Sequence, residues 1–123
     1  MQDTPSTSGQ EALLKLSAQL SVPMDTLRSV LEIFYNEYKN FPDRTATFIQ
    51  NNDWPALLSS VHKFKGASGS LQMHNLRAQL VELEIKLKQG ETVSVKDLQP
   101  LYQEMQHVIN CYQLASLSTH SAL

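Results

Sequence analysis

The chain has 123 residues, 41% of them hydrophobic, which is enough for one domain with a single core. Its formal net charge is −2 and its ten basic residues are dispersed along the sequence, which argues against nucleic acid as a partner. No stretch approaches the roughly 20 continuous apolar residues that cross a bilayer, so we expect no direct membrane contact. The single cysteine, Cys111, excludes an internal disulfide and suits a cytoplasmic protein; we expect it to be buried.

Several helices are predicted in the first half of the chain. Residues 1–9 are polar and are expected to form a flexible linker. Ser8 and Glu11 have the spacing of a capping box, which predicts a short helix through about Leu20. A second helix begins near Pro23 and carries an apolar stripe with steps of three and four residues: Leu27, Val30, Leu31, Phe34, Tyr38 and Phe41. Pro42 should kink or divide it before helical pattern resumes through Ile49.

The second half predicts three more helices. Asp53 is a good N-cap for a helix that starts near Pro55 and has an apolar stripe at Leu57, Val61, Phe64, Ser68 and Leu71. The next helix ends before Gly90 and carries Leu76, Leu80, Leu83 and Leu87. Asp97 can cap a last helix whose inward side chains are Leu98, Leu101, Met105, Val108, Ile109 and Tyr112. Short loops predict an all-α fold, an antiparallel up-down four-helix bundle with an additional N-terminal helix, over residues 10–117, followed by a tail at 118–123.

His62 lies one residue beyond the apolar stripe of its helix, about 100° round the axis, so its imidazole should reach solvent. Gly66 and Gly69 share its face, and each costs about 1 kcal/mol against alanine inside a helix. Their missing side chains let another surface approach the ring, and Lys65 can place an ammonium near a group attached to it. A surface histidine is usually idle, however, and glycines can serve helix packing. Spacing alone therefore leaves a reactive histidine and a passive surface about equally open.

The segment from His62 to Leu71, His-Lys-Phe-Lys-Gly-Ala-Ser-Gly-Ser-Leu, resembles the H-x-x-K-G-[AS] signature of the histidine-phosphotransfer domain family. The resemblance includes Asn52–Leu57 upstream and Leu83–Glu84 downstream, and it extends from about Leu27 to about Ile109. Gln72 departs from the family, which commonly has glycine ten residues after the histidine. There we expect a changed turn and a changed partner preference, with acceptor function retained.

The resemblance implies that His62 is the phosphoacceptor, that Lys65 stabilises the phosphoryl group, and that Gly66 gives room to the partner. Gly69 and Glu84 would complete the docking site for a receiver domain of a response regulator. The chain offers no acidic cluster for Mg²⁺ and no nucleotide-binding loop, so we expect the partner to supply Mg²⁺ and the acceptor aspartate. We expect no ATP-dependent kinase activity in this chain itself. His74, His107 and His120 lack metal-ligand spacing, so no metal site is expected.

Two other functions stay open. In a passive helical adaptor, His62 would only line a docking groove, and binding would survive its replacement. In the input domain of a chemotaxis-type kinase, the phosphoryl donor would be ATP bound to the kinase. The short polar end after Tyr112 favours instead the C-terminal module of a bacterial hybrid sensor kinase. Such a module is expected to be monomeric and cytoplasmic, whether free or attached to an inner-membrane kinase.

Overall fold

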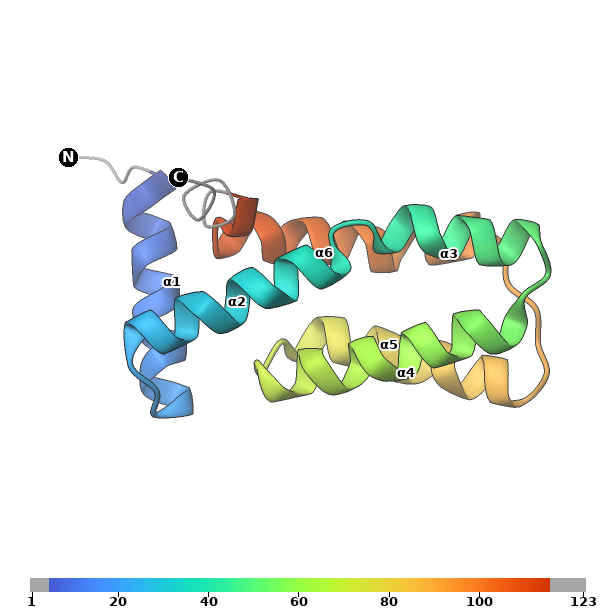
Figure 1. The fold of residues 1–123 in the computed structure, drawn as a ribbon, viewed down its shortest axis with the longest axis horizontal. Helices are drawn as coiled ribbons and strands as arrows, with labels where there is room; N and C mark the ends of the chain where they lie inside the picture. The colour runs from blue at the N-terminus through green and yellow to red at the C-terminus, as the bar shows by residue number, and fades with distance from the viewer. Residues whose placement is uncertain (1–4, 116–123) are drawn as a thin grey trace. The chain divides into compact units, whose positions relative to one another are not determined.

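The computed structural model describes residues 5–115, with side chains from Gly9 onward, and the regular secondary structure of this part of the chain is helical (Figure 1). Its elements are α1 (Pro5–Leu20), α2 (Met24–Tyr38), α3 (Phe41–Gln50), α4 (Trp54–Ser70), α5 (His74–Lys88), the 3-10 helix η1 (Lys96–Leu98) and α6 (Gln99–Cys111). No strand occurs within the described range, so the predicted all-α class is confirmed. None of the described helices is long and apolar enough to span a membrane.

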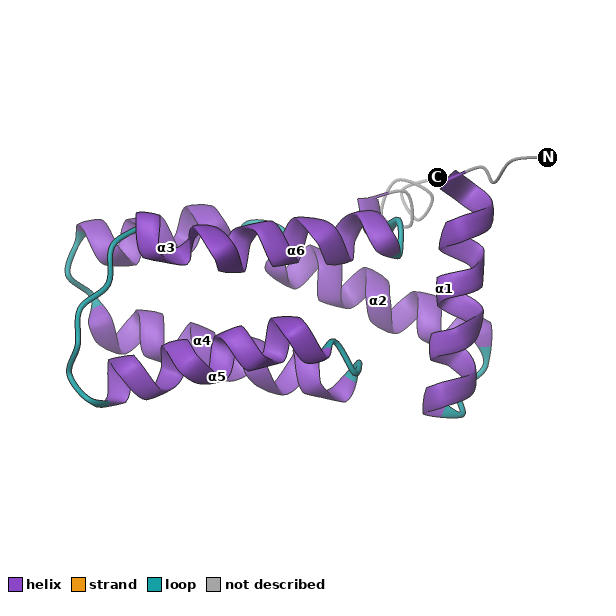
Figure 2. Cartoon of the chain, turned by 180° about the vertical axis from the view of Figure 1, so that it is seen from behind, coloured by secondary structure: helices purple, strands orange, loops and turns teal. Residues whose placement is uncertain are grey.

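Short loops connect the helices (Figure 2), and the chain forms two compact units. One unit comprises Tyr38–Met105, and the other comprises the residues up to Glu37 together with those from Gln106 onward. The side chains buried in the second of these include Leu13, Leu16, Leu27, Leu31, Phe34, Val108 and Leu114. The 38–105 unit buries a longer apolar set, including Phe41, Leu57, Val61, Phe64, Leu71, Met73, Leu76, Leu80, Leu83, Leu87, Val93, Leu98, Leu101 and Met105.

Three helix boundaries fall where the sequence places them. Pro42 divides the second predicted helix: α2 ends at Tyr38, and Pro42 lies in the first turn of α3, where its missing N–H costs no hydrogen bond. Asp53 caps α4, since its Oδ1 accepts a hydrogen bond from the backbone nitrogen of Ala56 at 3.3 Å. Gly90 follows α5 with a φ of 83°.

Other boundaries differ from the prediction. Helix α1 begins at Pro5, so Ser8 lies inside it, and residues 5–9 of the expected linker are helical. Asp97 lies inside η1 and does not cap α6, because this 3-10 helix, with Val95 at its N-cap, comes ahead of α6. Ser94 N donates to Asp97 Oδ2 at 2.9 Å and Asp97 N donates to Ser94 Oγ at 3.2 Å, a reciprocal capping box. The expected tail at 118–123 lies outside the described residues.

Two predicted burials are also wrong. Val30 is 41% exposed, because it lies at the edge of the stripe that Leu27, Leu31 and Phe34 bury at steps of four and three. Cys111, the last residue of α6, is exposed. It lies beside the face of the helix on which Met105 and Val108 are buried.

Aromatic packing fixes the rotation of α4 within the 38–105 unit. The fully buried Phe64 stacks on Tyr38 with ring centroids 4.2 Å apart, and Phe41 contacts its ring at 4.7 Å. With Leu57, Val61 and Phe64 held inward, His62 must lie about 100° from Val61 and point toward solvent. The predicted stripe of α4 therefore also determines where the histidine lies.

Left-handed backbone ends nearly every helix of the described range. Ser21, Asn52, Gln72, Gly90 and Gln113 all have φ between 53° and 83°, and only Gly90 is a glycine. At Gln72 the following Met73 N donates to Ser68 O at 2.9 Å, and Gln72 N donates to Gly69 O at 3.0 Å, which closes α4 as a Schellman-type cap. Gln72 therefore adopts the left-handed conformation that glycine favours, at a steric cost.

Replacing Gln72 with glycine should stabilise the chain. The left-handed conformation costs a non-glycine residue about 1–2 kcal/mol. Glycine avoids this cost, but its greater conformational freedom in the unfolded chain offsets about 0.5–1 kcal/mol of the gain. We expect Gln72→Gly to raise the free energy of unfolding by about 0.5–1 kcal/mol, measured by urea denaturation. Gln72→Ala is the control, since it removes the side chain but keeps the Cβ. An equal gain for both variants would contradict the assignment of the strain to the backbone.

Candidate functional site

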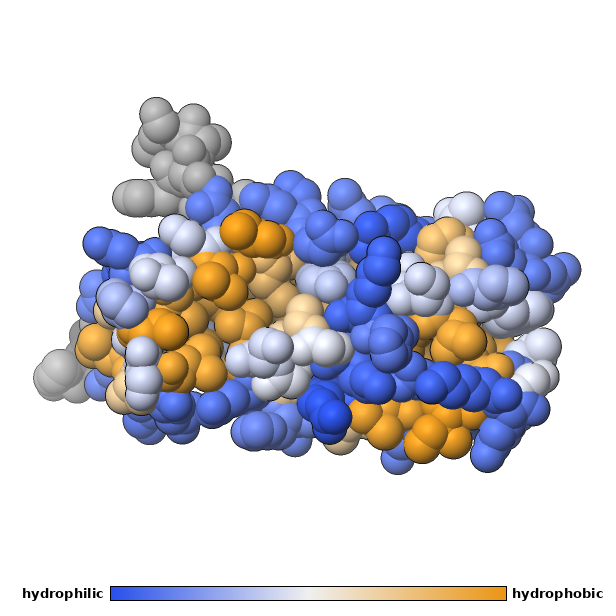
Figure 3. Space-filling model, turned by 60° about the horizontal axis from the view of Figure 1, so that its bottom comes forward, coloured by the Kyte–Doolittle hydropathy of each residue, from blue (hydrophilic) through white to orange (hydrophobic). Residues whose placement is uncertain are grey.

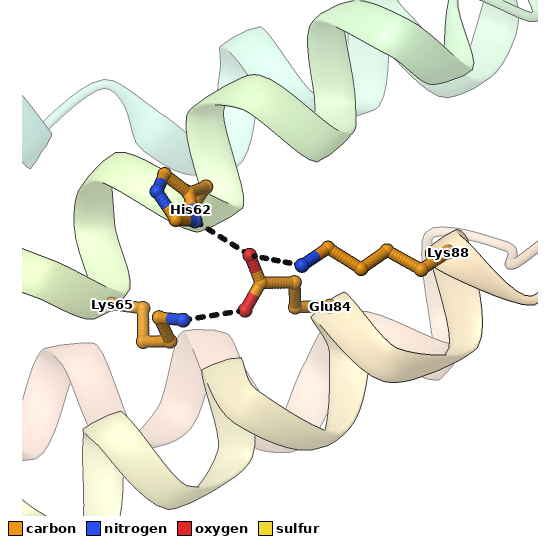
Figure 4. A network of polar contacts seen from close by, with 4 residues as sticks. All are labelled: His62, Lys65, Glu84 and Lys88. Carbon is orange, nitrogen blue, oxygen red and sulfur yellow. Dashed lines mark hydrogen bonds and ion pairs between the residues drawn. The ribbon is translucent and has the colours of Figure 1, made fainter.

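A histidine and a buried carboxylate face each other across α4 and α5, which lie side by side in the 38–105 unit. The His62 side chain is 64% exposed, whereas that of Glu84 on α5 is only 5% exposed. His62 Nδ1 lies 2.6 Å from Glu84 Oε2 (Figure 4). The imidazole is thus held by a carboxylate on one side and is open to solvent on the other.

Glu84 also forms ion pairs with two lysines. Lys65 Nζ donates to Glu84 Oε1 at 2.7 Å, and Lys88 Nζ lies 3.6 Å from Oε2, the oxygen that also contacts His62 (Figure 4). The hydrogen bond from Lys65, then that from His62, lower the pKa of the Glu84 carboxyl from 4.5 to about 2, although burial opposes the shift. Glu84 is therefore ionised at neutral pH, and its burial is offset by charge-assisted hydrogen bonds.

The ionised carboxylate determines the tautomer of the ring. A carboxylate can only accept hydrogen bonds, so the short contact requires His62 Nδ1 to carry a proton and donate it. In the neutral imidazole the lone pair is then on Nε2, the nitrogen on the far side of the ring from Glu84 and Lys88 (Figure 4). The lone pair is thus on the ring nitrogen that does not contact Glu84, in a side chain that is 64% exposed.

The two glycines of α4 differ in what surrounds them. A Cβ added to Gly66 would meet nothing within 4 Å, so the space beside the next turn of α4 is open. A Cβ on Gly69 would lie 2.9 Å from Arg77 Nε and 3.0 Å from its Cδ. Gly66 thus leaves the room that the sequence predicts, whereas the space at Gly69 is filled by the side chain of Arg77 from α5.

Other candidate sites lie elsewhere or are absent from the described residues. A hollow of about 320 Å³ lies on another side of α5, between it and the η1–α6 segment, and its lining includes Glu82, Lys86 and Asp97 but no residue of the His62 cluster. Within residues 5–115 no group of three or more His, Cys, Asp and Glu side chains could hold a metal ion.

On the face in Figure 3, apolar surface (orange) occurs in patches separated by hydrophilic residues (blue).

The structure brings together three residues singled out in the sequence, His62, Lys65 and Glu84. It adds Lys88, which sequence reasoning missed although it stands four residues after Glu84 on α5, the spacing of a helical ion pair. It also adds Arg77, whose contact with Gly69 depends on the packing of α4 against α5 and leaves no signal in the sequence.

The chain also matches the model of a known protein family. The model of the Hpt domain matches residues 10–115, most of the chain, and this range contains the His62 cluster. No curated protein and no solved structure matches the chain. The family match agrees with the all-helical structure and with the helical-bundle class predicted from the sequence. Because the match covers most of its length, the chain belongs to the Hpt domain family, whose members transfer phosphoryl groups through histidine in phosphorelays and interact with receiver domains.

Proposed function

We propose that His62 Nε2 accepts a phosphoryl group from the aspartate of a receiver domain and passes it to a second receiver domain. The observation that carries this proposal is the two-sided imidazole: Nδ1 is bound to a carboxylate that is only 5% exposed, while 64% of the side chain is open to solvent. A docked protein can therefore reach Nε2 without rearrangement of the ring.

Transfer of the phosphoryl group to His62 needs no external base, because Nε2 attacks with its own lone pair and no proton has to be removed. The Nε2 lone pair attacks the phosphorus of the aspartyl phosphate, and the bond to the aspartate oxygen breaks with its electron pair left on the carboxylate. The proton already on Nδ1 stays there, so the phosphorylated ring is a cation that faces the negative charge of Glu84. In the onward step a receiver carboxylate attacks the phosphorus, and the electron pair of the N–P bond returns to Nε2.

Lys65 supplies positive charge close to the reacting nitrogen. In the resting structure its ammonium is bound to Glu84 Oε1 at 2.7 Å and its side chain is 23% exposed. A dianionic phosphoryl group on Nε2 competes with Glu84 for this ammonium, which four rotatable bonds allow to turn outward. Lys65 therefore stabilises the phosphoryl oxygens after transfer, whereas Glu84 holds Lys65 and His62 in place before it.

The partner completes the reaction. Mg²⁺ and the acceptor aspartate belong to the receiver domain in this proposal, and Gly66 provides the open space for its approach. The chain acts as a monomeric relay in the cytoplasm, as a module of a hybrid sensor kinase, and it has no ATP-dependent kinase activity itself. Gln72, at the end of α4, contributes to the choice of receiver.

Transfer from a phosphorylated receiver domain tests this proposal. A panel of receiver domains is labelled with radioactive acetyl phosphate and Mg²⁺, freed of the donor, and mixed with the chain. We expect acid-labile, base-stable label on the chain, phosphorus NMR of a phosphohistidine at Nε2, and loss of the label to a second, unlabelled receiver. Failure of every receiver to label the folded chain would favour a passive adaptor, and labelling only by a kinase with ATP would favour the chemotaxis-type input domain.

A further inference from the structure

Positive charge is concentrated on the two helices that carry the His62 cluster. Helices α4 and α5 contain two acidic residues, Glu82 and Glu84, and five basic ones, Lys63, Lys65, Arg77, Lys86 and Lys88. This pair of helices therefore has a net charge of +3 with histidine neutral, although the whole chain has a net charge of −2. The dispersion of basic residues along the sequence conceals this excess of positive charge on the two helices that carry the candidate site.

Arg77 has a distinct position on these two helices. Its side chain lies across Gly69, where a Cβ would be 2.9 Å from Nε, so the absence of a side chain on α4 lets the guanidinium approach the helix backbone. Unlike Lys65 and Lys88, which contact Glu84, Arg77 has no ion pair with any carboxylate among the described residues. Its guanidinium, with five hydrogen-bond donors in a planar fork, is exposed and available to a partner.

Helix periodicity places Arg77 near the phosphoryl site. Gly69 follows His62 by seven residues, and Arg77 precedes Glu84 by seven residues, so each pair spans two turns on one face, or about 10 Å. A standard protein interface covers about 800 Å² on each partner, equivalent to a disc of about 16 Å radius. A receiver domain centred on His62 Nε2 therefore covers the open space at Gly66 and reaches Arg77.

We propose that Arg77 is a partner-contacting residue that pairs with a carboxylate on the docking face of the receiver domain and thereby helps to select the receiver. This inference rests on the proposed function and adds a specificity-determining residue to it. A receiver face with acidic residues around its phosphorylated aspartate is complementary in charge to α4 and α5. Complementary charges at an interface mainly raise the association rate and exclude partners with like charge.

Variants that separate docking from chemistry test the inference. Arg77→Gln removes the guanidinium, Gly69→Ala displaces it with a methyl group, and Arg77→Lys keeps the charge without the fork. Lys86→Gln is the matched control, because it makes the same change of charge on α5 but lies in the hollow with Asp97. Each is assayed at 25 mM and 200 mM salt with the phosphorylated receiver that reacts fastest with the native chain, and with phosphoramidate, a small donor that needs no docking.

For Arg77→Gln we expect kcat/KM with the receiver, relative to the rate with phosphoramidate, to fall about threefold to tenfold at low salt. The loss should shrink at high salt, Gly69→Ala should share it, Arg77→Lys should be intermediate, and Lys86→Gln should change the ratio less than twofold. Equal losses for Arg77→Gln and Lys86→Gln, or an Arg77→Gln loss that is as large with phosphoramidate as with the receiver, would overturn the inference. Labelling of the native chain by phosphoramidate but by no receiver would remove the proposed function itself.

Discussion

His62→Gln is expected to abolish labelling of the chain by a phosphorylated receiver, because glutamine has no nucleophilic nitrogen to form an N–P bond. The fold should be unaffected. His62 is 64% exposed, and Glu84 keeps Lys65 and Lys88 as partners when the imidazole is gone. The free energy of unfolding should therefore change by no more than about 0.5 kcal/mol, measured by urea denaturation alongside the transfer assay.

His74→Gln provides the matched control for this experiment. His74 is also exposed and lies at the first position of α5, away from Glu84, so its replacement should leave the label in place. Acid-labile label on His62→Gln at the native level would assign the acceptor to another residue. Loss of label in both variants would point to a general effect of the substitutions and would count against a specific role of His62.

The second large effect is expected for Glu84→Gln. An amide can accept a hydrogen bond from Nδ1, but it can equally donate one, so the variant no longer forces the lone pair onto Nε2. It also removes the negative charge that faces the phosphorylated ring and that holds Lys65. We expect the rate of transfer from the receiver to fall about tenfold to a hundredfold.

Glu82→Gln is the control for Glu84→Gln, since it is an exposed carboxylate on the same helix that lines the hollow beside α6. It should transfer at close to the native rate. A Glu84→Gln variant with native transfer kinetics and a native proportion of Nε2 phosphohistidine would contradict the role of Glu84 in setting the tautomer.

The same carboxylate gives the chain a defined dependence of stability on pH. Folding lowers the pKa of Glu84 from 4.5 to about 2, so its stabilising contribution is complete above about pH 5 and is lost as the pH falls toward 2. The native chain should therefore lose more stability over this interval than Glu84→Gln, which has no proton to take up there. Urea denaturation at several pH values between 6 and about 2.5 measures the difference, and parallel curves for the two proteins would contradict it.

Much of the fold follows from local rules that leave a mark in the sequence. The stripes of α4 and α5 are buried as their spacing predicts, Pro42 lies in the first turn of α3 after the break from α2, and Asp53 caps α4. The errors come from local backbone conformations that the spacing of apolar residues does not predict. The 3-10 turn η1 displaces the expected cap at Asp97, and Gln72 adopts a left-handed backbone that its residue type disfavours.

The site was predictable only in part. The offset of His62 from its stripe and the Gly66 gap are visible along a single helix. The burial of Glu84 and the position of Arg77 instead depend on the register between α4 and α5, which no single helix contains. Contacts between neighbouring helices therefore account for Arg77, whereas the pairing of Lys88 with Glu84 lies within α5 and has a visible i,i+4 spacing.

The position of His62 in the middle of a regular helix has a consequence for how long a complex lasts. The backbone of the site is already ordered once α4 has folded. Docking of a partner therefore costs this chain little further conformational entropy. An interface of standard size then gives useful affinity without especially strong contacts, and weaker contacts mean faster dissociation. A carrier that must release one partner before it meets the next gains throughput from such short residence times.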